Sequence, residues 1–80
     1  MTLTFNYNTL WQFSFTDPAY LAGDTYQLYI LGENEYTCTP GTTVTVQFFS
    51  TLPKSSYIYT VMKTRTTDNT ILQRGTINVI

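Results

Sequence analysis

The sequence has no histidine and only one cysteine, and these two shortages exclude several kinds of site. Cys38 is the only thiol among 80 residues. Ser-His and Cys-His catalytic pairs are therefore absent, and no intramolecular disulfide can form. A structural zinc site lacks ligands for the same reason. Cys38 is interpreted as a small core residue, because a lone cysteine at an inward strand position usually has that role.

Charge is also scarce. Four basic and five acidic residues give a net charge of −1, and charged residues make up 11% of the chain, against about 25% in average soluble domains. Four basic residues are too few to bind a phosphate backbone, and no nucleic-acid partner is therefore expected. Polarity comes instead from neutral side chains, including 17 threonines. A neutral hydroxyl-rich face costs less to cover with a neighbour than a charged one.

Long hydrophobic runs are missing too. The N-terminal segment MTLTFNYNTLWQ has no basic region, continuous apolar stretch or cleavage site of a signal peptide. No segment approaches the ~20 apolar residues of a membrane span. We therefore expect synthesis and folding in a cytoplasm and no membrane partner.

The length predicts a single domain, residues 1–80, that buries only ~60% of its unfolded surface. Because disulfides and zinc are excluded, assembly with other subunits is the reinforcement that remains for so small a domain.

What the sequence does contain is alternation of apolar and polar residues with a period of two, and no segment keeps the helical period of 3.6. The alternating segments recur roughly every ten residues, which is typical of antiparallel sandwiches and barrels. Gly75 near the end predicts a bulge or a close backbone approach. The prediction is an all-β, antiparallel sandwich of about seven short strands, at residues 2–7, 11–16, 25–31, 35–39, 43–49, 56–64 and 71–80.

The same alternation divides the apolar residues into two sets. Tyr20 and Leu21, in a connection bounded by Pro and Gly, are expected to cap one end of the core. The predicted core consists of Leu3, Phe5, Tyr7, Trp11, Phe13, Phe15, Tyr26, Leu28, Ile30, Tyr36, Cys38, Val44, Val46, Phe48, Tyr57, Tyr59, Val61, Ile77 and Val79.

Five apolar residues have no place in that core: Tyr29, Leu31, Phe49, Ile58 and Met62. On a small domain with few charges, we interpret them as an interaction surface covered by neighbouring subunits. Strand edges without charges favour the same interpretation. The alternative is that a bulge shifts the assigned faces by one residue.

Three groups of charged residues are candidate functional sites, and each also has a simpler structural interpretation, such as a turn or a solvated loop. Glu33 and Glu35 flank a turn as a carboxylate pair, yet such a pair needs a cleft to act on a sugar or hold a cation. Asp17 and Asp24 flank a loop and have the oxygens for Ca²⁺, but no dense acidic loop surrounds them, and Asp17 before a proline is typical of a turn start.

The third group is basic. Lys63 and Arg65 share a strand face and form a small patch if Arg74 lies beside them. Aromatic residues make up 16% of the chain and can stack on bases or sugars, but most are needed to fill the core. No group is assigned a catalytic role, and neither a metal nor a cofactor is expected.

The C-terminal segment, residues 51–80, carries a family resemblance. It combines a Leu-Pro turn, a Tyr-x-Tyr strand, a polar turn and a strand of the form Gly-Thr-apolar-x-Val. These are Leu52-Pro53, Tyr57 and Tyr59, Thr67-Asp68-Asn69, and Gly75-Thr76-Ile77-Asn78-Val79. The segment resembles the last hairpin of immunoglobulin-like domains in tailed-phage virion proteins, such as the baseplate upper-protein and head-decoration types.

Tyr57, five residues after Leu52, also resembles a tyrosine corner, whose hydroxyl bonds to upstream backbone. The first half of the chain does not match, and the Cys-Trp-Cys pattern of antibody domains is absent.

The resemblance implies an immunoglobulin-like sandwich that acts as a non-enzymatic structural or decoration (cement-like) protein of a phage virion. Its partners would be other virion proteins, such as capsid or tail subunits, or further copies of itself. Two alternatives stay open: a carbohydrate- or host-surface-binding β module, and a small phage-encoded inhibitor of a host protein.

Overall fold

The computed structural model describes residues 2–31 and 35–80. All seven expected strands are present, which confirms the all-β prediction, and the turn expected at 32–34 lies outside the described residues. No helix in this part of the chain is long and apolar enough to cross a membrane. The strands are β1 (Thr2–Phe5), β2 (Thr9–Thr16), β3 (Thr25–Ile30), β4 (Glu35–Cys38), β5 (Thr43–Ser50), β6 (Ser56–Arg65) and β7 (Asp68–Val79).

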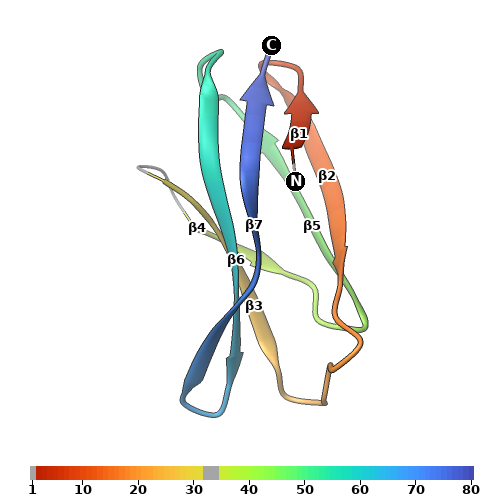
Figure 1. Cartoon of the computed structure of the whole chain (residues 1–80). Coiled ribbons are helices and arrows are strands. Elements are labelled where there is room, and N and C mark those ends of the chain that lie inside the picture. The colour runs from red at the N-terminus through yellow and green to blue at the C-terminus, as the bar shows by residue number, and fades with distance from the viewer. Residues whose placement is uncertain (1, 32–34) are drawn as a thin grey trace.

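The strands form two sheets that pack as a sandwich. One sheet has the order β1-β7-β6-β3-β4, and the other contains only β2 and β5 (Figure 1). An isolated bridge between Thr39 and Thr45 links the end of β4 to β5. The centre of the larger sheet is therefore the β6 strand, which pairs with β3 on one side and with β7 on the other.

One strand pair departs from the antiparallel expectation. β1 runs parallel to β7, whereas the other pairings are antiparallel. β1 forms no hairpin with β2, because the chain crosses to the other sheet at the turn where Asn8 has a left-handed φ of 59°. Ile80 N donates to Phe5 O at 2.9 Å and Tyr7 N donates to Ile80 O at 2.9 Å. These bonds hold the turn against the end of β7.

The core lies between the sheets and is rich in aromatic rings. Trp11 is fully buried and stacks on Phe5 with ring centroids 4.8 Å apart, and its Nε1 donates to Asn6 O at 3.2 Å. Phe15 of the small sheet meets Tyr59 of the large one. The sandwich interior is therefore filled by side chains from both layers.

The predicted core is confirmed with one exception, and the predicted cap is half right. Every residue of the predicted core is buried or half-buried except Tyr7, which is 47% exposed, because β1 ends at Phe5 and Tyr7 lies in the turn. Tyr20 packs against the core, but Leu21 is 57% exposed. Leu52 is an additional buried residue.

The connection from β5 to β6 contains the expected tyrosine corner. The Tyr57 hydroxyl donates to Pro53 O at 2.7 Å. Leu52 N donates to the buried Ser50 Oγ at 3.2 Å. The side chains of Ser50 and Tyr57 thus bond both ends of the Leu-Pro turn, which fixes where β6 begins.

The β6–β7 hairpin is tighter than the sequence predicts. Arg65 pairs with Asp68, so only Thr66 and Thr67 form the loop, and Thr66 has a left-handed φ of 56°. Further along, Val61 pairs with Gln73 while Met62 pairs with Ile71. One extra residue in β7 therefore makes a bulge. It lies three residues before Gly75, which itself pairs with Tyr59.

Candidate functional surface

The outer face of the five-stranded sheet gathers most of the leftover apolar residues. On β6, Val61 and Lys63 are buried, so the alternate residues Ile58, Thr60 and Met62 face outward. On β3, Tyr29 pairs with Thr60, and just beyond the strand Leu31 N donates to Ile58 O at 2.9 Å. Three of the five predicted interaction residues therefore adjoin one another: Tyr29 (40% exposed), Leu31 (71%) and Ile58 (52%). We call these three the Ile58 cluster.

The Ile58 cluster borders a shallow depression of about 330 Å³, whose lining is completed by Thr60 and Arg74. Arg74 pairs with Thr60 across β6 and β7. Burial, followed by the neighbouring Glu35 carboxylate, raises the pKa of Tyr29, so its phenol stays a neutral donor. The depression thus combines an aromatic ring, two aliphatic side chains and a few polar groups.

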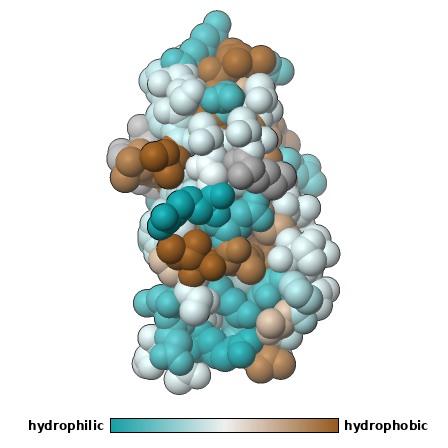
Figure 2. All heavy atoms as spheres, viewed as in Figure 1, coloured by the Kyte–Doolittle hydropathy of each residue, from teal (hydrophilic) through white to brown (hydrophobic). Residues whose placement is uncertain are grey.

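Met62 and Ile71 form a second apolar pair on the same face. They are register partners on β6 and β7; Met62 is half-buried and Ile71 is 50% exposed. Sequence reasoning missed Ile71, because strict alternation from Ile77 puts it inside, whereas the bulge in β7 turns it outward. Seen from this side, hydrophobic residues form separate groups with hydrophilic ones between them (Figure 2).

Phe49 does not belong to this surface. It lies on β5 of the other sheet, opposite Leu10 of β2, and the two side chains are 59% and 55% exposed. Leu10 was also missed, because the predicted strand began at residue 11 instead of 9. The five predicted residues are therefore divided between the two outer faces of the sandwich.

Four of the charged residues converge elsewhere, in an ion cluster at the end of the sandwich where the loop between β2 and β3 meets the end of β6. We use this name for Asp17, Asp24, Lys63 and Arg65. Lys63 Nζ lies 2.6 Å from Asp17 Oδ2 and 3.5 Å from Asp24 Oδ2. Arg65 Nε and Nη2 each donate to Asp24 at 2.9 Å. Two anions and two cations therefore balance one another.

Neutral groups complete the cluster. The Tyr26 hydroxyl donates to Asp17 Oδ2, and Ala19 N donates to Asp17 Oδ1 at 3.1 Å. Ala19 O accepts from both Lys63 and Arg65. Buried polar atoms in a low-dielectric interior require such partners, and no buried side-chain N or O atom in the described ranges is left without one.

The cluster sets the protonation of its members. The hydrogen bond from Lys63 and then that from Tyr26 lower the pKa of Asp17 against the opposing effect of burial. The hydrogen bonds from Arg65 and from Leu21 N lower the pKa of Asp24. Burial and the bond to Asp17 raise the pKa of Tyr26. Both carboxylates are therefore ionised and the phenol is neutral at physiological pH.

This geometry answers two of the sequence hypotheses. Asp17 and Asp24 lie near each other, but Lys63 Nζ contacts both carboxylates and Arg65 binds Asp24, so cations of the chain occupy the oxygens that would bind calcium. Asp17 also accepts from Ala19 N and so starts the turn. The predicted basic patch of Lys63, Arg65 and Arg74 does not form. Lys63 and Arg65 are bound to aspartates, whereas Arg74 lines the depression on the outer sheet face. Within residues 2–31 and 35–80, no three His, Cys, Asp or Glu residues group as a metal site.

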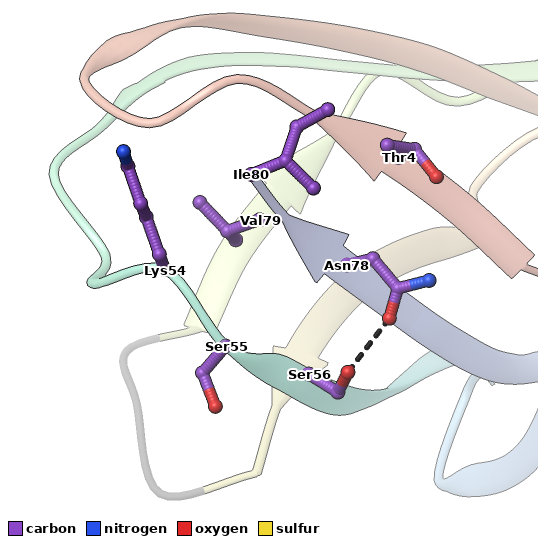
Figure 3. Close-up of a pocket in the computed structure, with 7 residues that line it drawn as sticks. All are labelled: Thr4, Lys54, Ser55, Ser56, Asn78, Val79 and Ile80. Atoms are coloured by element: carbon purple, nitrogen blue, oxygen red, sulfur yellow. Dashed lines mark hydrogen bonds between the residues drawn. The ribbon is translucent and has the colours of Figure 1, made fainter.

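A larger polar groove of about 600 Å³ lies at the opposite end, where β1, β6 and β7 meet. Ser56 Oγ donates to Asn78 Oδ1 at 2.7 Å, and Lys54 and Ile80 stand on either side of Val79 (Figure 3). The lining consists of Thr4, Lys54, Ser55, Ser56, Asn78, Val79 and Ile80. Its polar groups are the hydroxyls of Thr4, Ser55 and Ser56, the Asn78 amide and the Lys54 ammonium.

Cys38 lies in the core as predicted, with 2% of its surface exposed. Burial raises the pKa of its thiol to about 11, so the nucleophilic thiolate is scarce near neutrality. In the carboxylate pair, Glu33 lies outside the described residues and Glu35 is exposed on β4.

Comparison with protein families, with curated proteins and with solved structures finds no match to this chain.

Proposed function

We propose that this protein is a non-enzymatic structural or decoration subunit of a tailed-phage virion, and that it assembles through the outer face of its five-stranded sheet. The observation that carries the proposal is the Ile58 cluster: three large apolar side chains, each at least 40% exposed, adjoin on one sheet face. An exposed apolar group with a polar surround is typical of a protein interface.

The distribution of charge supports the same proposal. The ion cluster pairs four of the nine charged residues with one another at one end of the sandwich, and three of them, Asp17, Asp24 and Lys63, are buried. The charged groups near the Ile58 cluster are Arg74, which lines the depression, and Glu35, the register partner of Tyr29. Covering this face with a neighbour therefore requires little desolvation of ions, the step that makes charged surfaces costly to bury. Many copies with individually weak contacts hold a particle together through multivalency.

The phage assignment depends on the resemblance of residues 51–80 to virion immunoglobulin-like domains. Two features of the fold support an immunoglobulin-like sandwich. In such domains the third, sixth and seventh strands (C, F and G) share one sheet, which faces a second sheet, and a tyrosine near the start of the sixth strand bonds to upstream backbone. Here β3, β6 and β7 share a sheet, and Tyr57 bonds to Pro53.

The decisive experiment is to search for the protein in purified particles of the phage that encodes it, by quantitative mass spectrometry. Many copies per particle are expected for wild type. Ile58→Asp should abolish incorporation, because it places a charge in the covered contact. Thr2→Asp is the matched control, since Thr2 is exposed on β1 of the same sheet, outside the cluster, and should incorporate normally. Circular dichroism checks that both variants fold. Absence of the wild-type protein from particles would refute the proposal.

A carbohydrate-binding module is the second candidate, because the depression sets the Tyr29 ring beside Thr60 and Arg74. Aromatic rings with adjacent polar groups bind sugars by stacking and hydrogen bonding. This function predicts glycan-dependent quenching of tyrosine fluorescence in a monomer, lost in Tyr29→Ala. An inhibitor of a host protein would instead elute as a one-to-one complex with a single host protein.

A further inference from the structure

The β2 strand has an open edge. Its only strand partner in the described part of the chain is β5, and in Figure 1 it forms the outside of the small sheet. In an antiparallel pair, the N–H and C=O groups of alternate residues point away from the partner. Asp17 N donates to Thr42 O at 2.8 Å, and by alternation Phe15, Phe13 and Trp11 also bond to β5.

The backbone groups of Leu10, Gln12, Ser14 and Thr16 therefore point to the open side. An independent pair of hydrogen bonds confirms which residues of β2 point to the open side. Thr45, the register partner of Ser14, exchanges both backbone bonds with Thr39 on its other side, so it makes none with Ser14. All four open residues are exposed.

This edge has none of the usual protection. Residues 9–16 read TLWQFSFT, eight residues without a charge, a proline or a glycine, and their pairing with β5 runs without a bulge. Natural edge strands are normally short, charged, bulged or covered. The other edges in this fold are guarded: β1 and β4 have four residues each, β4 carries Glu35, and the Thr39–Thr45 bridge covers part of β5.

We propose that β2 pairs antiparallel with the β2 strand of a second copy of this chain, around a two-fold axis at Phe13. That register uses all four open residues. It sets Leu10 opposite Thr16 of the second copy and Gln12 opposite its Ser14. Each of these two pairs exchanges two backbone hydrogen bonds. The two-fold axis repeats both pairs, which gives about eight hydrogen bonds in total. The two small sheets become one four-stranded sheet with the order β5-β2-β2-β5.

The strand itself favours a second copy as the occupant. A two-fold interface needs a self-complementary patch, and here every cross-strand pair is neutral, so no like charges oppose each other. A charged partner segment would find no opposite charge along residues 9–16 to select it. The contact involves the small sheet only, so it is independent of the outer face of the large sheet used in the proposed function.

Sedimentation velocity over a concentration series, combined with amide hydrogen exchange, tests the pairing. Wild type should dimerise reversibly. The amides of residues 10, 12, 14 and 16 should gain protection as concentration rises, whereas those of 11, 13 and 15 stay protected throughout. This alternation is specific to edge pairing, because association through side chains alone would not select every second amide.

A charge-swap experiment tests the register. Gln12→Lys/Ser14→Lys sets lysines opposite each other twice across the axis, so the dimer dissociation constant should rise at least about tenfold. Gln12→Glu/Ser14→Glu should behave likewise, and a mixture of the two variants should form a heterodimer. Thr43→Lys/Gln47→Lys adds the same charge to exposed positions on β5 and is the control, with a much smaller effect. Ile58→Asp should leave this dimer intact, which separates it from the proposed function.

Concentration-independent exchange at residues 10, 12, 14 and 16 in a monomer would overturn the proposal. A dimer that survives both charged variants with an unchanged dissociation constant would overturn it as well, since the contact would then lie elsewhere.

Discussion

Replacing Lys63 with methionine is the sharpest test of how the ion cluster holds this fold. The Lys63→Met change keeps most of the aliphatic stem but removes the ammonium that lies 2.6 Å from Asp17 Oδ2. The Asp17 side chain is only 5% exposed, so water does not replace the lost partner. Removing one member of a buried ion pair leaves an uncompensated charge in a poorly polarisable environment.

The expected loss is about 3 kcal/mol in the free energy of unfolding, the lower end of the range for broken buried pairs. It lies at the lower end because Tyr26 and Ala19 N still donate to the carboxylate. For a domain of this size each kcal/mol shifts Tm by about 4–8 °C, so Tm should fall by about 15 °C. Total stabilities of small domains are about 5–15 kcal/mol, which makes this a large fraction.

Urea and thermal unfolding followed by circular dichroism at pH 7 measure the effect. The double variant Lys63→Met/Asp17→Asn should recover part of the loss, because a neutral amide oxygen still accepts from Tyr26 without needing a cation. Lys54→Met is the matched control: Lys54 is exposed and should change stability by less than about 0.5 kcal/mol. If the double variant is no more stable than Lys63→Met, the uncompensated charge is not the cause.

Acid titration tests the same cluster. Asp17 and Asp24 have pKa values lowered in the folded protein from an ordinary 3.8. Their contribution to stability is therefore complete above about pH 4 and is lost as the pH falls through the folded values. Wild type should lose stability steeply below pH 4, and Lys63→Met more gradually. Identical acid profiles would contradict the assigned role of Lys63.

Three further changes probe other parts of the fold. Tyr57→Phe removes the bond to Pro53 O and should lower stability by about 1 kcal/mol in urea unfolding; no loss would mean that the corner bond is not stabilising. Thr66→Gly relieves a left-handed β-branched residue and should raise Tm, gaining about 0.5–1 kcal/mol after the chain-entropy cost of glycine; a lower Tm would refute that strain. Cys38, whose thiol pKa is raised from 9.0 to about 11, stabilises the fold fully below pH 9 and loses this contribution as the pH rises through 11. Cys38→Ala should therefore show a smaller decline in stability than wild type between pH 9 and 11 in the same assay, and an equal decline would assign the effect to other groups, such as Tyr26.

The sequence was sufficient to predict the secondary structure and nearly all of the core. Alternation with a period of two reflects the strand backbone itself, so it marks which side chains face inward without knowledge of any partner. That is why Trp11, Tyr59 and Val61 were placed correctly. The tyrosine corner was expected from a resemblance, and it too is local, because its two ends are four residues apart.

Prediction failed where a bulge or a turn altered the alternation. Ile71 faces outward because the extra residue in β7 reverses the side of every residue before it in that strand. Tyr7 faces solvent because Asn8 turns the chain there. Neither event leaves a clear sign in a short polar and apolar pattern.

Contacts between distant segments were decided only by the tertiary structure. The parallel pairing of β1 with β7 and the separation of Phe49 from the Ile58 cluster depend on which sheet each strand joins. The ion cluster joins Asp24 to Arg65 across 41 residues of sequence, and neither residue by itself indicates the other. Local alternation is a property of one strand, whereas pairing, register and charge neutralisation depend on how strands far apart in the sequence pack together.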